Sequence, residues 1–220
     1  MSSPNAPGTP AHDVYALGRH QSNPTVTGHG EGGPSSPRTI VGYGFWIYLL
    51  SDIVMFSAFF AAYAVLADEH AGGPGQRELF GQGRVALETA VLLLSSFTCG
   101  MASAAADRKA IMWTQGWQLA TGILGAAFLA LEVQEFAIMA SEGAGPQRSA
   151  FLSAFFALVG LHGLHIAVGL LWLGTMMAQL GAKGFQPTVL RRMMCFNLFW
   201  HALDIIWVGL FTIVYLIGIT

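Results

Sequence analysis

Eight ionisable side chains lie inside otherwise apolar stretches of this 220-residue chain, where charged groups are rare. They are Asp52, Glu88, Glu132, Glu135, His162, His165, His201 and Asp204. Six of the eight form pairs spaced three residues apart, and residues at this spacing share one face of a helix. An ionisable group in the middle of a bilayer costs at least about 2.5–3.5 kcal/mol, so each of these groups needs a partner or a function.

The predicted depth of these side chains in the membrane divides them into two groups. At 1.5 Å of helix rise per residue, the first group lies about 12–22 Å into its apolar stretches, close to the middle of the bilayer. This mid-plane polar layer consists of Asp52, His162, His165, His201 and Asp204. The second group is predicted in the outer half of the membrane. This outer acidic layer consists of Glu88, Glu132 and Glu135.

Three kinds of chemistry fit the mid-plane polar layer. Two histidines on different helices could ligate a haem iron, but His162 and His165 are too close on one helix to sandwich the same iron, so His201 would have to take part. Intramembrane acids and histidines also line transport and proton-relay paths. The simplest alternative is a set of hydrogen bonds that fasten helices together, worth about 0.6 kcal/mol each.

The elements that position these residues are predicted to be five transmembrane helices. Five long stretches exclude all ten Lys and Arg residues and all nine prolines. They are Ile40–Ala67, Val85–Ala106, Thr114–Ala140, Ala150–Leu180 and Met193–Gly218. The shortest has 22 residues, and about 20 are needed to cross the hydrocarbon core. Alternating segments of about 10 residues, typical of membrane barrels, are absent from the sequence. We therefore predict an all-α integral membrane bundle.

Composition supports this prediction. Hydrophobic residues make up 54% of the chain and charged residues 10%, whereas a soluble domain has about 25% charged residues. The net charge of −2 gives no basic surface for nucleic acid. Residues 1–38, rich in Gly, Pro, Ser and His, are predicted to be a disordered cytoplasmic tail, and residues 39–220 the membrane domain. Cys99 and Cys195 suggest neither a disulfide framework nor a metal site.

The basic residues predict the orientation of the bundle. With the N-terminus inside the cell, the inner segments hold Arg19, Arg38, Arg108, Lys109, Lys183, Arg191 and Arg192. The outer segments hold Arg77, Arg84 and Arg148. This excess of basic residues in the inner segments satisfies the positive-inside rule, so we predict an inside N-terminus and an outside C-terminus.

Four segments resemble subunit III of the haem–copper terminal oxidases. They are Gly44–Asp52 (GFWIYLLSD), Leu131–Phe136 (LEVQEF), Gly160–Gly169 (GLHGLHIAVG) and Phe199–Trp207 (FWHALDIIW). The resemblance covers roughly residues 40–220 and all five predicted helices, in the same order. The combination of His-Gly-Leu-His in the fourth helix with Trp-His-x-x-Asp-x-x-Trp in the fifth is its most specific part.

The resemblance implies a non-redox accessory subunit in a bacterial plasma membrane. Haem and copper are then expected in a partner catalytic subunit I, which assembles with subunits II and IV, reduces dioxygen to water and pumps protons. The family implies that subunit III supports assembly, binds phospholipid and sustains proton uptake. Catalytic, metal-binding and cofactor-binding residues are therefore not expected in this chain. Asp52 falls where many members carry a glutamate, so this acid is shorter by one methylene.

The number of helices and the residues of two segments suggest a branch of the family. Five helices, together with Gly44–Asp52 and Arg148–Gly160, resemble the quinol-oxidising, bo-type bacterial enzymes. The first alternative is subunit III of a bacterial cytochrome c oxidase or of a nitric oxide reductase relative. An alternative of another class is a free-standing transporter that uses the mid-plane polar layer.

Overall fold

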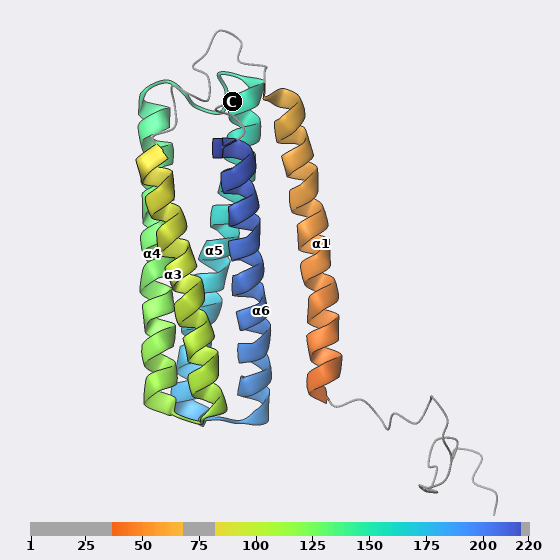
Figure 1. Cartoon of the computed structure of the whole chain (residues 1–220), viewed down its shortest axis with the longest axis vertical. Coiled ribbons are helices and arrows are strands. Elements are labelled where there is room, and N and C mark those ends of the chain that lie inside the picture. Colours follow the sequence, from red (N-terminus) through yellow and green to blue (C-terminus); the bar gives the residue numbers. More distant parts are fainter. Residues whose placement is uncertain (1–36, 68–81, 217–220) are drawn as a thin grey trace, which may run out of the picture. The chain divides into compact units, whose positions relative to one another are not determined.

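The computed structural model describes residues 37–67 and 82–216, and within them the chain forms five long helices (Figure 1). They are α1 (Pro37–Leu66), α3 (Gln82–Asp107), α4 (Ile111–Ser141), α5 (Ala150–Lys183) and α6 (Pro187–Leu210), and the π-helix η1 (Phe211–Leu216) continues α6. Each long helix has the length and the apolar composition needed to cross a membrane. The predicted all-α bundle with five transmembrane helices is confirmed.

The helix boundaries differ from the predicted ones, most clearly at α6. The apolar stretch was expected to begin at Met193, but α6 begins at Pro187. Proline suits the first turn of a helix, where its missing N–H has no partner to lose. The added residues at the start of α6 include Arg192. Its Nη1 donates a 2.6 Å hydrogen bond to Gln179 Oε1 of α5. Hydropathy marks only the apolar part of such a helix and misses its polar start.

The predicted tail shows a similar boundary difference. Residues 1–36, for which disorder is predicted, lie outside the described residues. Pro37 and Arg38, which were assigned to the tail, already belong to α1. The last two residues of the fifth predicted stretch, Ile217 and Gly218, also lie outside the described residues.

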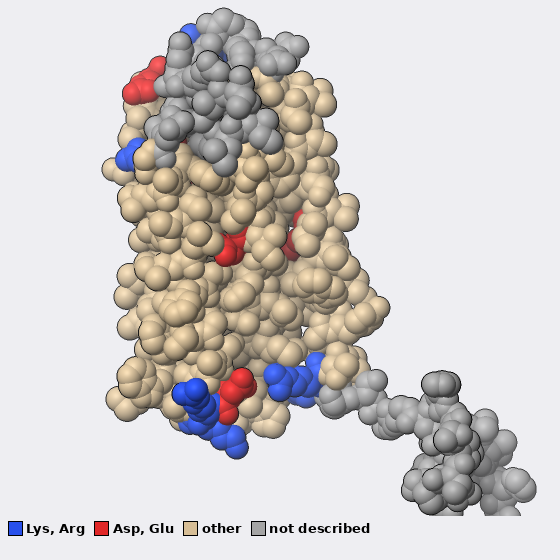
Figure 2. Space-filling view, in the orientation of Figure 1, with Lys and Arg blue, Asp and Glu red and all other residues tan. Residues whose placement is uncertain are grey.

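Four of the helices form a ring, and α1 packs on its outside. In the ring α3 contacts α4, α4 contacts α5, α5 contacts α6, and α6 closes back on α3. α1 contacts α5 and α6 and stands at the edge of the bundle, as Figure 1 shows. Charged side chains gather at the two ends of the bundle, and the surface between them is largely uncharged (Figure 2).

Two tryptophans of α6 fill the middle of the ring. Trp200 lies over Gly125 of α4 and Gly169 of α5, where a Cβ atom on either glycine would be 2.9 Å from its ring. Trp207 packs edge-on against Phe128 of α4, with ring centroids 4.7 Å apart. Glycine lets neighbouring helices approach closely, so the large indoles fit because the facing residues are small.

Hydroxyl groups of α3 bind the indoles of α6. Trp200 Nε1 donates to Ser95 Oγ at 3.0 Å, and Trp207 Nε1 donates to Thr89 Oγ1 at 3.1 Å. Ser95 Oγ in turn donates to the carbonyl oxygen of Thr121 in α4 at 3.2 Å. A buried indole N–H usually needs such a partner, and these bonds fix how α3, α4 and α6 are rotated against one another.

Candidate functional site

The structure does not gather the mid-plane polar layer into one cluster. His162 is fully buried inside the ring of helices. Its imidazole packs against Trp207 at 5.2 Å, Phe128 at 5.9 Å and Phe56 of α1 at 6.4 Å, measured between ring centroids. Neither ring nitrogen has a hydrogen-bond partner among the described residues. His162 thus sits in an aromatic enclosure.

His165, three residues further along α5, has different surroundings. It is half-buried, and its Nδ1 lies 2.8 Å from the carbonyl oxygen of Leu161. Its ring centroid is 5.2 Å from that of Phe56, so α1 covers it. The backbone contact satisfies one ring nitrogen without any second helix. The His-Gly-Leu-His segment therefore places one imidazole in the core and the other beneath α1.

The remaining members of the layer lie nearer to the surface. His201 and Asp204 of α6 and Asp52 of α1 are half-buried. Among the described residues His201 Nδ1 and Asp204 Oδ1 have no hydrogen-bond partner, although the Ser96 hydroxyl of α3 approaches the Asp204 carboxyl. Asp52 lies close enough to interact with the phenol of Tyr48, one turn earlier in α1. Sequence reasoning overlooked Tyr48, although its spacing of four residues from Asp52 points to this contact.

The donor atoms in this layer do not fit a haem or a metal ion. A haem needs open space beside its ligating imidazole, but aromatic rings of α1, α4 and α6 cover His162. Across residues 37–67 and 82–216, no three His, Cys, Asp or Glu side chains lie close enough to hold a metal ion. The layer instead consists of separate polar contacts at neighbouring helix surfaces.

The outer acidic layer does come together. Glu88 of α3 and Glu132 and Glu135 of α4 are all buried, and their charges interact. The Glu132 carboxylate occupies the space above Gly163 of α5, where a Cβ atom would be 3.0 Å from Oε2. No described residue hydrogen-bonds the carboxylate oxygens of Glu88 or Glu132. The prediction that Glu132 and Glu135 share a helix face agrees with their common burial.

Among the described residues, one cation interacts with this cluster. Arg84, half-buried in the first turn of α3, interacts with the charges of Glu88 and Glu135, and its Nη2 donates to Gln134 Oε1 at 3.1 Å. A single guanidinium balances a single carboxylate. A neutral cluster of three carboxyls and one guanidinium therefore carries two protons. The outer acidic layer can hold protons inside the bundle, near the end of the helices where α3 begins.

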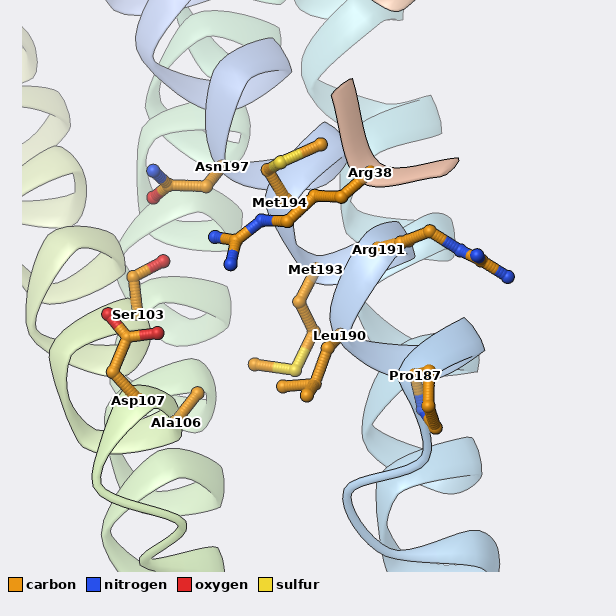
Figure 3. Close-up of a pocket in the computed structure, with 10 residues that line it drawn as sticks. All are labelled: Arg38, Ser103, Ala106, Asp107, Pro187, Leu190, Arg191, Met193, Met194 and Asn197. Carbon is orange, nitrogen blue, oxygen red and sulfur yellow. The ribbon is translucent and has the colours of Figure 1, made fainter. Parts of the chain in front are cut away.

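A pocket of about 610 Å³ opens at the opposite end of the bundle, between the start of α1, the end of α3 and the start of α6. Figure 3 shows the Arg38 guanidinium extending across it toward α3, from which Ser103 and Asp107 point inward, while Arg191 points away. The Arg38 guanidinium and the Ser103 hydroxyl suit an anionic group, and the Asp107 carboxylate suits a cationic one. Sequence reasoning missed this pocket because its charged residues belong to three separate helix ends.

Comparison with known proteins gives one consistent result. The family model described as cytochrome c oxidase subunit III matches residues 27–219. The chain is 45% identical over 202 residues to cytochrome bo(3) ubiquinol oxidase subunit 3 of Pseudomonas aeruginosa, a match that covers 92% of this chain and 97% of the relative. It is 48% identical over 176 residues to the Pseudomonas putida protein of the same name, covering 80% of this chain and 85% of that relative. Quinol oxidase subunit 3 of Bacillus subtilis is 41% identical over 176 residues, covering 80% and 86%.

Proposed function

Because this chain belongs to the cytochrome c oxidase subunit III family, we propose that it is the accessory subunit III of a bacterial bo3-type ubiquinol oxidase. The observation that carries this proposal is the match to ubiquinol oxidase subunit 3 at 45% identity over nearly the whole of both chains. Respiratory electron transfer is then the process in which the chain takes part. The alternatives of a cytochrome c oxidase subunit and of a nitric oxide reductase relative have less support, since the relatives reported above are named quinol oxidases.

We assign the redox chemistry to a catalytic partner subunit of the oxidase. Of the described imidazoles, His162 is enclosed by aromatic rings and His165 contacts the backbone of its own helix, so these two suit packing better than iron ligation. A catalytic subunit I then carries haem and copper, reduces dioxygen to water and pumps protons, with subunits II and IV alongside. This chain supports assembly of that unit and sustains its proton uptake.

The proposed place of the chain is the bacterial plasma membrane, with its N-terminus inside. Arg38 at the start of α1 and Arg191 and Arg192 at the start of α6 lie at one end of the bundle, in agreement with the positive-inside rule. With this orientation the outer acidic layer lies toward the outside of the cell. The 610 Å³ pocket then opens toward the cytoplasm.

This pocket is the proposed place for a phospholipid. Arginine binds phosphate through paired N–H donors, and the Arg38 guanidinium extends across the pocket, at the end of the bundle where α1 begins. Leu190, Met193 and Met194 of α6 offer an apolar wall for an acyl chain. Asp107 on the far wall favours a headgroup that carries an amine as well as a phosphate.

Replacing Asp52 by Asn tests the accessory role. The amide keeps the volume and the hydrogen-bonding capacity of the side chain but removes a titratable proton. We expect oxygen consumption by the intact complex to begin near the parent rate, because electron transfer takes place in the partner. If Asp52 only contacts Tyr48, the rate of oxygen consumption stays equal to that of the parent throughout the assay. If Asp52 sustains proton uptake, the rate falls faster during turnover than the rate of the parent.

The content of this subunit is measured after the assay, so that dissociation is not mistaken for inactivation. Ser57→Ala is the matched control, because the Ser57 hydroxyl donates to the carbonyl of Ile53 in its own helix. An immediate and complete loss of activity in fully assembled Asp52→Asn complex would mean that this chain carries chemistry itself. The accessory role would then be wrong.

A further inference from the structure

A second and much smaller cavity adjoins the 610 Å³ pocket. Its volume is about 10 Å³, about the smallest space that holds one water molecule. Ser103 of α3 and Met193 and Asn197 of α6 line both the small cavity and the large pocket. Figure 3 shows these three side chains at the pocket. The small cavity therefore lies directly behind these residues, as seen from the pocket.

Polar groups from three helices meet at the small cavity. They are the Gln118 amide of α4, the Asn197 amide of α6, and the Ser103 hydroxyl and Cys99 thiol of α3. A buried water molecule usually makes about three hydrogen bonds, and these groups include both donors and acceptors. Cavities that stay empty are typically apolar, so this lining favours water over a void. We call this space the Gln118 cavity.

The Gln118 side chain has an acceptor without a donor. Gln118 lies about 10 Å along α4, and only 3% of its surface is exposed. Its Oε1 atom has no hydrogen-bond partner among the described residues. Burying an amide oxygen without a donor is unfavourable, because the hydrogen bonds that water would make to it are not replaced. We therefore expect a donor at this atom.

Two neighbouring groups already use their hydrogens elsewhere. Thr121 also lines the cavity, but its Oγ1 donates to the carbonyl oxygen of Trp117 in the same helix at 2.9 Å. Cys99 Sγ donates to Asn197 Oδ1 at 3.4 Å. Neither hydroxyl nor thiol is therefore directed at Gln118. The missing donor has to come from a small molecule in the cavity.

We infer that one water molecule occupies the Gln118 cavity, that it enters from the 610 Å³ pocket, and that it donates a hydrogen bond to Gln118 Oε1. The volume excludes a larger ligand, and the lining contains no carboxylate that would hold a hard metal ion. The water molecule bridges α4 to the polar groups of α3 and α6. The inference concerns this chain alone and does not depend on the proposed function.

The Cys99 thiol is a built-in probe for this water molecule, because it lines the same cavity. The S–H stretch absorbs in a region of the infrared spectrum that is nearly free of other protein bands. The assembly is purified through a tag on this chain and transferred to D2O. The difference from the same assembly with Cys99→Ala isolates the Cys99 band. We expect this band to exchange to S–D within minutes, and a band that persists for hours would overturn the inference.

A variant tells whether exchange depends on the bound water molecule. Gln118→Met keeps the length of the side chain but removes the acceptor oxygen, so water should leave the cavity. Loss of one hydrogen bond is expected to slow exchange at Cys99 about fivefold. Gln115→Met is the matched control, since Gln115 lies one turn earlier in α4 and does not line the cavity. Equal exchange in Gln118→Met and Gln115→Met would mean that helix motion, and not a resident water molecule, exposes the thiol.

Density for the parent assembly provides a test without any substitution. In a map that resolves other buried water molecules, we expect one peak within hydrogen-bond distance of Gln118 Oε1. An empty cavity, or a Gln118 amide bonded directly to a protein donor, would overturn the inference.

Discussion

Adding one methyl group at Gly169 is expected to destabilise the bundle by about 1–3 kcal/mol, the usual cost of overpacking a well-filled core. A Cβ atom there would lie 2.9 Å from Trp200 and 3.1 Å from Phe199. Neither ring can move aside easily. Trp200 is bonded to Ser95 and also lies 2.9 Å from the Cβ position of Gly125. The expected readout is a lower thermal unfolding midpoint for Gly169→Ala.

Gly174→Ala is the matched control on the same helix, because a Cβ atom at Gly174 has no neighbour within 4 Å. Its midpoint is expected to stay close to that of the parent, since surface substitutions usually change stability by less than about 0.5 kcal/mol. Equal midpoints for Gly169→Ala and Gly174→Ala would show that the Trp200 ring relaxes freely. Close packing of α5 against α6 would then not hold the bundle together.

Removing the cation beside the outer acidic layer is the second change with a large expected effect. Breaking a buried ion pair costs about 3–5 kcal/mol because a charge is left alone. Arg84 is only half-buried, so we expect Arg84→Leu to destabilise the chain by roughly half as much, about 2 kcal/mol. The loss is measured from unfolding of the chain in detergent.

A second substitution tells whether the loss comes from charge. Glu135→Gln, introduced together with Arg84→Leu, removes a carboxylate that interacts with Arg84, so it should recover much of the stability. Arg148→Leu serves as control, since Arg148 is an exposed arginine just before α5. If Arg84→Leu behaved like Arg148→Leu, the three carboxyls would be stable without a cation. The idea of a balanced cluster would then be wrong.

The sequence predicts the helices well because a membrane span leaves a strong and simple signal. A run of more than 20 apolar residues without Lys, Arg or Pro rarely occurs outside a transmembrane helix. The burial of Glu132 and Glu135 was predictable from their spacing and from the cost of exposing a carboxyl to lipid. The depth of His201 and Asp204 also follows from counting residues along α6.

The grouping of the mid-plane polar residues was not predictable in the same way. Depth and spacing place His162, His165 and His201 in one layer, but they do not say which way each helix is rotated. That rotation depends on the indoles of Trp200 and Trp207, on small residues opposite them, and on hydroxyls of α3. In an apolar sequence these residues look like ordinary packing, so the aromatic enclosure of His162 became visible only in the structure.

The most direct test of the central claim is purification of this chain, through its own tag, from native membranes in mild detergent. We expect it to come with a haem-bearing catalytic subunit, in equal amounts and with quinol oxidase activity. After dissociation, the Soret absorption should remain with the partner and not with this chain. A chain that purified alone as a functional oligomer, or that showed a bis-imidazole haem spectrum by itself, would contradict the assignment as an accessory oxidase subunit.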